Sequence, residues 1–111
     1  MRATCVLVWA VLVPFATAGA RERVVDQKGR QFSAAKLEVE VGDVVRFVNS
    51  DDFFHNVFSH SPAKRFDLGW YPRGQSRSVK LDHPGVVEVE CAIHPGMKLR
   101  IHVAPAKPPR N

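Results

Sequence analysis

Cysteine is scarce in this chain, which limits how the fold can be held together. Only Cys5 and Cys91 are cysteines among the 111 residues. Cys5 lies in an N-terminal segment that we expect to be removed, so no disulfide can form within the mature chain. Small exported domains bury only about 60 to 65% of their unfolded surface and commonly use disulfides as a supplement. This chain must hold its fold without one.

Long apolar runs are also missing beyond the first residues. The apolar segment 6–13 is shorter than the roughly 20 residues that a membrane-spanning helix needs, and no second one follows. It lies after the basic residue Arg2 and before a stretch of small residues, which is the order of a secretory signal peptide. We therefore expect residues 1–20 to be a signal peptide cleaved after Ala18 or Ala20. We also expect a periplasmic location and no membrane span.

The charge balance is modestly basic. Lysine and arginine exceed the acidic residues, which gives a formal net charge of +5 at pH 7. An exported domain of this kind tends to meet acidic protein surfaces or anionic headgroups. The basic residues are scattered and no aromatic platform accompanies them, so we expect no nucleic-acid partner.

Most of the remaining sequence alternates apolar and polar residues with a period of two, and no helical period exceeds two turns. Residues 37–41 and 45–47 surround the turn signal Gly42-Asp43 and predict an amphipathic hairpin. Further strands are predicted at 75–81, 87–91 and 99–103. Residues 61–74 are irregular, and we expect a loop with one helical turn. Several short strands separated by turns indicate an all-β fold, a small sandwich or barrel.

Three ligand-type side chains follow the predicted strand 87–91 at intervals of three residues. They are a thiol, an imidazole and a thioether, on Cys91, His94 and Met97. His55, which lies between β-forming residues upstream, supplies a second imidazole. These soft, polarisable groups are the set that a mononuclear copper site uses. A lone thiol in an oxidising compartment is more readily explained as a ligand than as a free group.

At these residues the chain strongly resembles the cupredoxins, the small blue copper proteins. The short Cys-X-X-His-X-X-Met loop is similar to that of the amicyanin-like, methylamine utilisation members. The resemblance covers residues 21–104, expected to be one domain before a flexible Pro-rich tail at 105–111. It implies a small Greek-key β-sandwich. It also implies one copper ion held by a group of four side chains, which are His55, Cys91, His94 and Met97.

The resemblance also gives Asn56 a role beside the ligands. In the family, the residue after the first histidine ligand joins the two ligand loops, and its backbone N–H donates to the thiolate. Such outer contacts tune a metal site. A binuclear purple-copper centre is excluded because it needs two thiolates, and a multicopper oxidase is excluded because the chain has no His-X-His pair.

Other interpretations of these residues are weaker. Cys91 and His94 could form a thiol nucleophile and its base, but no third orienting group is visible. Zinc could use the same ligands, although a thioether is a poor zinc ligand. His60 is either a solvated loop residue or an additional metal ligand. We interpret Phe53, Phe54 and Phe58 as core residues, and Trp70-Tyr71 as core or an apolar docking surface.

The function implied by the resemblance is the transfer of single electrons between redox partners, such as a cytochrome c and a dehydrogenase. We expect a monomer without enzymatic activity, with His94 as the electron port. Lys64, Arg65 and Lys98 are candidate basic neighbours of that port. Two alternatives stay open, a periplasmic copper carrier and a small type 2 copper enzyme resembling nitrosocyanin. In the enzyme, His60, Glu90 or water would replace Met97.

Overall fold

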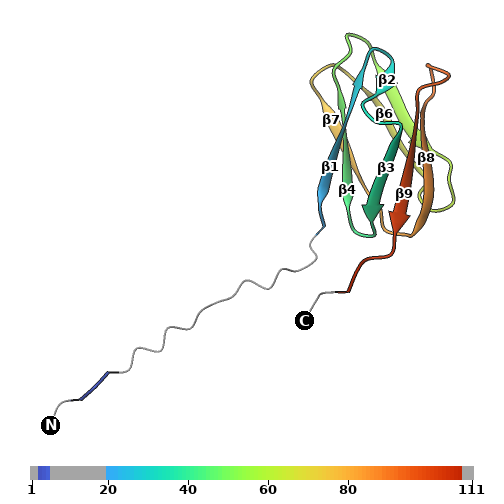
Figure 1. The fold of residues 1–111 in the computed structure, drawn as a ribbon. Coiled ribbons are helices and arrows are strands. Elements are labelled where there is room, and N and C mark those ends of the chain that lie inside the picture. The colour runs from blue at the N-terminus through green and yellow to red at the C-terminus, as the bar shows by residue number, and fades with distance from the viewer. Residues whose placement is uncertain (1–2, 6–19, 109–111) are drawn as a thin grey trace.

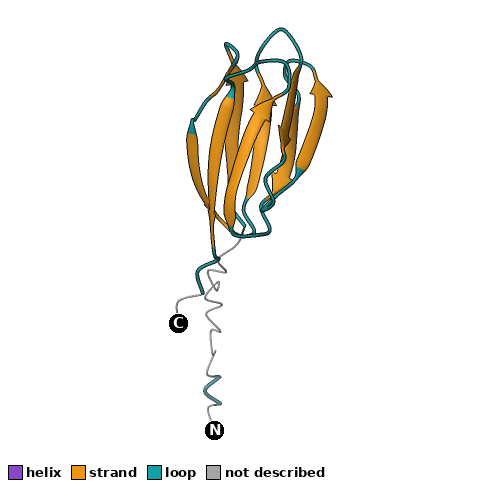
Figure 2. Ribbon diagram, turned by 90° about the vertical axis from the view of Figure 1, so that its right-hand side faces the viewer, coloured by secondary structure: helices purple, strands orange, loops and turns teal. Residues whose placement is uncertain are grey.

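The computed structural model describes residues 3–5 and 20–108. Most of the expected signal peptide and the last residues of the expected tail lie outside these ranges. Two β-sheets pack face to face, and the described residues contain no helix (Figures 1 and 2). The strands are β1 (Glu22–Lys28), β2 (Gln31–Phe32), β3 (Lys36–Glu40), β4 (Val44–Asn49), β5 (His55–Ser59), β6 (Phe66–Tyr71), β7 (Ser76–Lys80), β8 (Gly85–Cys91) and β9 (Lys98–Ala104).

One sheet has the strand order β2-β1-β4-β7 and the other has the order β3-β9-β8-β5-β6. Both sheets are mixed, because β1 pairs with β4 and β3 pairs with β9 in parallel, while the other pairs are antiparallel. The structure therefore confirms the predicted all-β sandwich. Among the described residues, no helix has the length and apolar character that crossing a membrane requires.

The strands predicted near the ligand motif are confirmed as β8 and β9. Their alternating sequence determines which side chains enter the core. In β8, Val87, Val89 and Cys91 are buried, whereas the intervening Glu88 is exposed. β9 follows the same pattern and pairs antiparallel with β8. Fully burying one such valine stabilises the fold by roughly 1.5–3 kcal/mol. This packing fixes the end of β8, and with it the position of Cys91.

The predicted hairpin over residues 37–47 is wrong. β3 and β4 belong to different sheets, and the turn at Gly42-Asp43 carries the chain from one sheet to the other. β3 pairs with β9, and β4 pairs with β1 and β7. A period of two identifies the buried face of a strand but not its partner, and both strands turn their apolar face to the same core.

The loop predicted over residues 61–74 is also partly wrong. Its middle, residues 66–71, is the edge strand β6, which pairs with β5. Residues 62–63 form a turn, and the expected helical turn is not present. β6 contains Gly69 with φ of 70°, and a glycine inside a strand weakens the sequence signal for that strand. Tyr71 is buried in the core and Trp70 is exposed.

Strands β1 and β2 were not predicted, and a buried polar residue explains the omission. Gln27 occupies a core-facing position of β1 and is fully buried, so the apolar alternation is interrupted. Its side-chain amide donates to the hydroxyl of Tyr71 at 2.7 Å and to the carbonyl of Val48 at 3.2 Å. The amide nitrogen of Gln27 is thus paired inside the protein, as buried polar groups usually are, while its Oε1 atom is buried without a hydrogen-bond partner among the described residues.

The turn between the two sheets supports a prediction about acid stability. The buried carboxylate of Asp43 accepts N–H groups from Arg21 at 3.0 Å and from Glu40 at 2.9 Å. Burial raises the pKa of Asp43, but the hydrogen bonds from Glu40 and Arg21 and the Arg21 charge outweigh it and lower the pKa below its usual value. This stabilisation is complete above the unfolded-state pKa of about 3.9 and is lost as pH falls through the lower folded-state value.

We expect Asp43→Asn to destabilise the protein by about 1–3 kcal/mol at pH 7, because an amide group then faces a backbone donor. The difference from wild type should shrink as the pH falls below about 4. Urea unfolding at neutral and acidic pH measures both effects. Glu38→Gln, on the exposed face of β3, is the matched control. An equal loss at both pH values would show that the carboxylate charge contributes nothing.

Candidate metal centre

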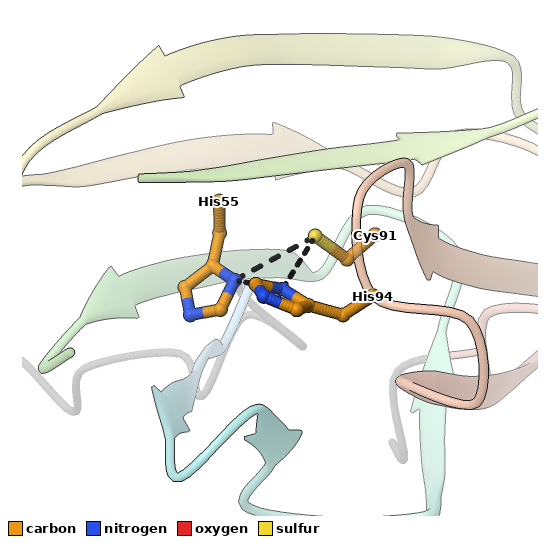
Figure 3. Close-up of side chains that lie close together, drawn as sticks. All are labelled: His55, Cys91 and His94. Atoms are coloured by element: carbon orange, nitrogen blue, oxygen red, sulfur yellow. Dashed lines mark hydrogen bonds between the residues drawn. The ribbon is translucent and has the colours of Figure 1, made fainter. Parts of the chain in front are cut away.

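Three donor atoms meet where β5 begins and β8 ends. The loop between β8 and β9 lies at this end of the sandwich, which is the upper end in Figure 1. The Sγ atom of Cys91 lies 3.6 Å from Nδ1 of His55 and 3.6 Å from Nδ1 of His94. The two Nδ1 atoms are 3.2 Å apart. Figure 3 shows the thiol and both rings directed at the space between them. The structure therefore brings together residues from two strands and a loop that are distant in sequence.

This donor set fits one soft metal ion. Metal–sulfur bonds of about 2.3 Å and metal–nitrogen bonds of about 2.0 Å place ligands around one ion at separations of this order. One thiolate and two imidazoles match the ligand preference of copper. The group is enclosed, because His55 and Cys91 are buried and His94 is half-buried. These three residues are positioned to bind one copper ion.

His55 is held by a residue that the sequence reasoning missed. His55 is the first residue of β5, and its Nε2 atom lies 2.6 Å from Oδ2 of Asp51. Asp51 also accepts the N–H groups of Gly29 at 2.7 Å and Arg30 at 3.2 Å. Burial raises the pKa of Asp51, but the bonds from His55 and these N–H groups lower it below its usual value. A carboxylate at Nε2 directs Nδ1 toward the metal.

We expect Asp51→Asn to weaken copper binding about 10- to 100-fold, the usual cost of losing the partner of a ligating histidine. The substitution preserves size but removes the charge that orients the His55 ring. Competition with a chelator of known affinity measures the change. Asp52→Asn is the matched control, because that carboxylate is exposed and pairs with Arg73. Equal affinities in the two variants would contradict an orienting role for Asp51.

The loop between β8 and β9 presents the other candidate ligands. The Cys91 N–H donates to the Met97 carbonyl at 3.4 Å, and this hydrogen bond joins the two ends of the loop. Within the loop, the Met97 N–H donates to the His94 carbonyl at 3.1 Å. Gly96 adopts a φ of 98°, which glycine reaches without strain. The Met97 side chain is buried beside the loop. That Met97 is the fourth copper ligand stays a prediction.

Asn56 connects the two ligand-bearing segments through its backbone. Its carbonyl accepts the N–H of Ala92 at 3.2 Å, so the residue after His55 is tied to the residue after Cys91. The pairing of Val57 with Cys91 continues this connection between β5 and β8. The predicted hydrogen bond from the Asn56 N–H to the thiolate stays a prediction.

The prediction that Phe53 and Phe54 pack in the core is wrong. Phe53 is 37% exposed and Phe54 is 51% exposed. The Phe53 ring packs on the imidazoles, with its centroid 5.1 Å from that of His55 and 5.3 Å from that of His94. Burial is the largest cause that lowers the pKa of His94, followed by the charges of His55 and Arg30. Ile93 is exposed beside His94 in the sequence.

Several other candidates lie away from the donor group. β5 runs from His55 to Ser59 at about 3.3 Å per residue, so His60 is at the opposite end of that strand. Its ring lies 4.9 Å from that of Phe58. Lys64 and Arg65 precede β6 at that same far end, so they are not neighbours of His94 as predicted. Lys98 is near the site but pairs with Glu90 at 3.7 Å.

Comparison with known proteins agrees with this geometry. The methylamine utilization protein MauL of Methylorubrum extorquens is 32% identical over 69 residues, 61% of this chain, and the match spans 60% of that relative's length. A reduced amicyanin variant is 27% identical with a TM-score of 0.66 and covers 78% of this chain and 84% of its own. A copper-containing nitrite reductase from Thermus scotoductus is 28% identical with a TM-score of 0.68, over 77% of this chain and 22% of its own. Residues 20–104 match the copper binding proteins of the plastocyanin/azurin family, and the chain belongs to this family.

Proposed function

We propose that this protein is an exported type 1 copper protein that carries single electrons between redox proteins. The observation that carries the proposal is the buried thiol of Cys91 between two imidazole Nδ1 atoms, at separations of 3.6 Å. Copper in such a site exchanges one electron as it alternates between Cu(I) and Cu(II). The similarity to amicyanin and to the methylamine utilization protein MauL supports the same function.

The contribution of the protein is to hold its ligands still. His55 is fixed by Asp51 on one side and by strand pairing on the other. Cys91 ends a buried strand, and two backbone hydrogen bonds close the loop that follows it. Met97 would complete the set as a weak fourth ligand. Ligands that cannot relax keep the reorganisation between the two oxidation states small, which favours rapid electron transfer.

His94 is the proposed electron port, because it is the one half-exposed member of the donor group. Three exposed apolar side chains lie in the loops that lead to His55 and that contain His94. They are Phe53 and Phe54 between β4 and β5, and Ile93 between β8 and β9, and they would exclude water from the contact with a partner protein. A cytochrome c or a dehydrogenase in the periplasm is the proposed type of partner. We propose that the protein acts as a monomeric carrier and not as an enzyme.

The spectrum of the copper-loaded protein tests this function. An intense visible thiolate-to-copper band with narrow hyperfine splitting, and reversible one-electron reduction, are expected. A copper carrier would instead release its metal readily to an acceptor protein and show no reversible redox couple. A weak band with the wide splitting of a type 2 site would overturn the proposal and favour the enzyme alternative.

A further inference from the structure

The turn between β1 and β2 is joined to the metal centre by hydrogen bonds to Asp51. Gly29 and Arg30 both adopt positive φ, 64° and 59°, so the chain reverses sharply there. The backbone N–H groups of both residues donate to Asp51, the same carboxylate that holds His55. The position of Arg30 is therefore set by the site itself, although Arg30 is distant from every candidate ligand in the sequence.

The side chain of Arg30 extends over an aromatic ring that touches both imidazoles. Its guanidinium carbon lies 5.5 Å from the centroid of Phe53, a cation–π contact. Phe53 in turn packs on His55 and His94. The loop that carries Phe53 is held by the Asn49 side chain, which donates to the Phe53 carbonyl at 3.0 Å. A fixed cation thus lies beside the port on a ring that is itself half-exposed.

Two other cations at this end of the molecule are paired with carboxylates, whereas Lys28, which is exposed at the end of β1, adds a second positive charge beside Arg30. Arg73 pairs with Asp52, and Lys98 pairs with Glu90. Within the part of the chain that the structure describes, the guanidinium group of Arg30 forms no ion pair with a carboxylate within 4.0 Å. The charge that an approaching molecule meets beside the port is therefore positive.

We propose that Arg30 and Phe53 form a cationic aromatic cap beside His94 that selects a redox partner with an acidic contact surface. This inference rests on the proposed electron-carrier function and specifies its partner. The ring supplies an apolar contact that removes water, and the guanidinium attracts negative charge toward the port. The Phe53 ring centroid lies 5.5 Å from the Arg30 guanidinium and 5.3 Å from the His94 ring, so the Arg30 charge is within roughly one Debye length of His94 at 0.1 M salt, about 10 Å. At that range the charge acts on a partner that contacts His94.

Oxidation of the reduced, copper-loaded protein by two small complexes of opposite charge tests the cap. Hexacyanoferrate(III) is the anionic probe, and tris(phenanthroline)cobalt(III) is the cationic probe. The ratio of the two rates reports the charge at the port, because a change in reduction potential alters the driving force for both probes in the same direction. The variants are Arg30→Gln, Arg30→Lys and Phe53→Leu. Lys80→Gln is the matched control, since Lys80 is exposed on β7 at the far end of the sandwich.

We expect Arg30→Gln to lower the anion-to-cation rate ratio about threefold or more at 0.01 M ionic strength, and to have no effect on it near 1 M. Arg30→Lys should restore most of the ratio, and Phe53→Leu should lower it partly because the guanidinium loses its support. A ratio that changes equally in Arg30→Gln and Lys80→Gln would overturn the inference. A wild-type rate ratio in Phe53→Leu would show that the aromatic ring has no part in the effect of Arg30. Failure of the wild-type protein to react with either probe would instead refute the electron-carrier function.

Discussion

Replacing Cys91 with Ser should abolish the intense visible band of the copper-loaded protein. The thiolate is the one strongly covalent ligand in the donor group, and a hydroxyl cannot provide the charge transfer that causes the band. Copper affinity should fall by more than the 10- to 100-fold typical of an outer partner of a ligand. Absorption spectroscopy and chelator competition measure both effects.

The same substitution should leave the fold intact. Cys91 and Ser are similar in size, and a hydroxyl there can form hydrogen bonds with the nearby nitrogens of His55 and His94. We expect a cost of about 1 kcal/mol in the metal-free protein. A Cys91→Ser protein that stays intensely coloured would disprove the type 1 assignment.

The donor group could be predicted because its chemistry is local in sequence. Cys91 is the last residue of a strand with a clear period of two, and His94 follows it three residues later. His55 is predicted as the second imidazole from its place among β-forming residues, and the family resemblance then gives it the role of a ligand. The structure adds that the three donors approach one another, which spacing alone does not establish.

The supports of the site could not be predicted, because they depend on tertiary contacts. Asp51 is one of two adjacent aspartates, and only the fold shows that it is buried against His55 while Asp52 stays on the surface. Phe53 was assigned to the core on its apolar character, yet its partners are imidazoles at the rim. Gln27 concealed β1 because a buried polar residue interrupts the alternation. The position of each of these residues depends on contacts with parts of the chain that are distant in sequence, which a local sequence pattern does not contain.

The last prediction concerns the removal of copper. His55 begins β5, and Cys91 ends β8, so an ion bound between them connects segments that are far apart in the sequence. An ion that binds the folded state alone stabilises it by about 4 kcal/mol when its free concentration is a thousand times its dissociation constant. For a domain of this size, that corresponds to a rise in the melting temperature of roughly 15–30 °C.

We therefore expect the metal-free protein to melt well below the copper-loaded protein, with a difference that grows with copper concentration. Thermal unfolding followed by circular dichroism measures this, with Cu(I) added anaerobically so that the free thiol is not oxidised. The Cys91→Ser protein should gain little from the same addition, because the connection between β5 and β8 loses its thiolate. An equal gain in both proteins would mean that copper stabilises the fold from another position. The thiol would then have no part in holding the two strands together.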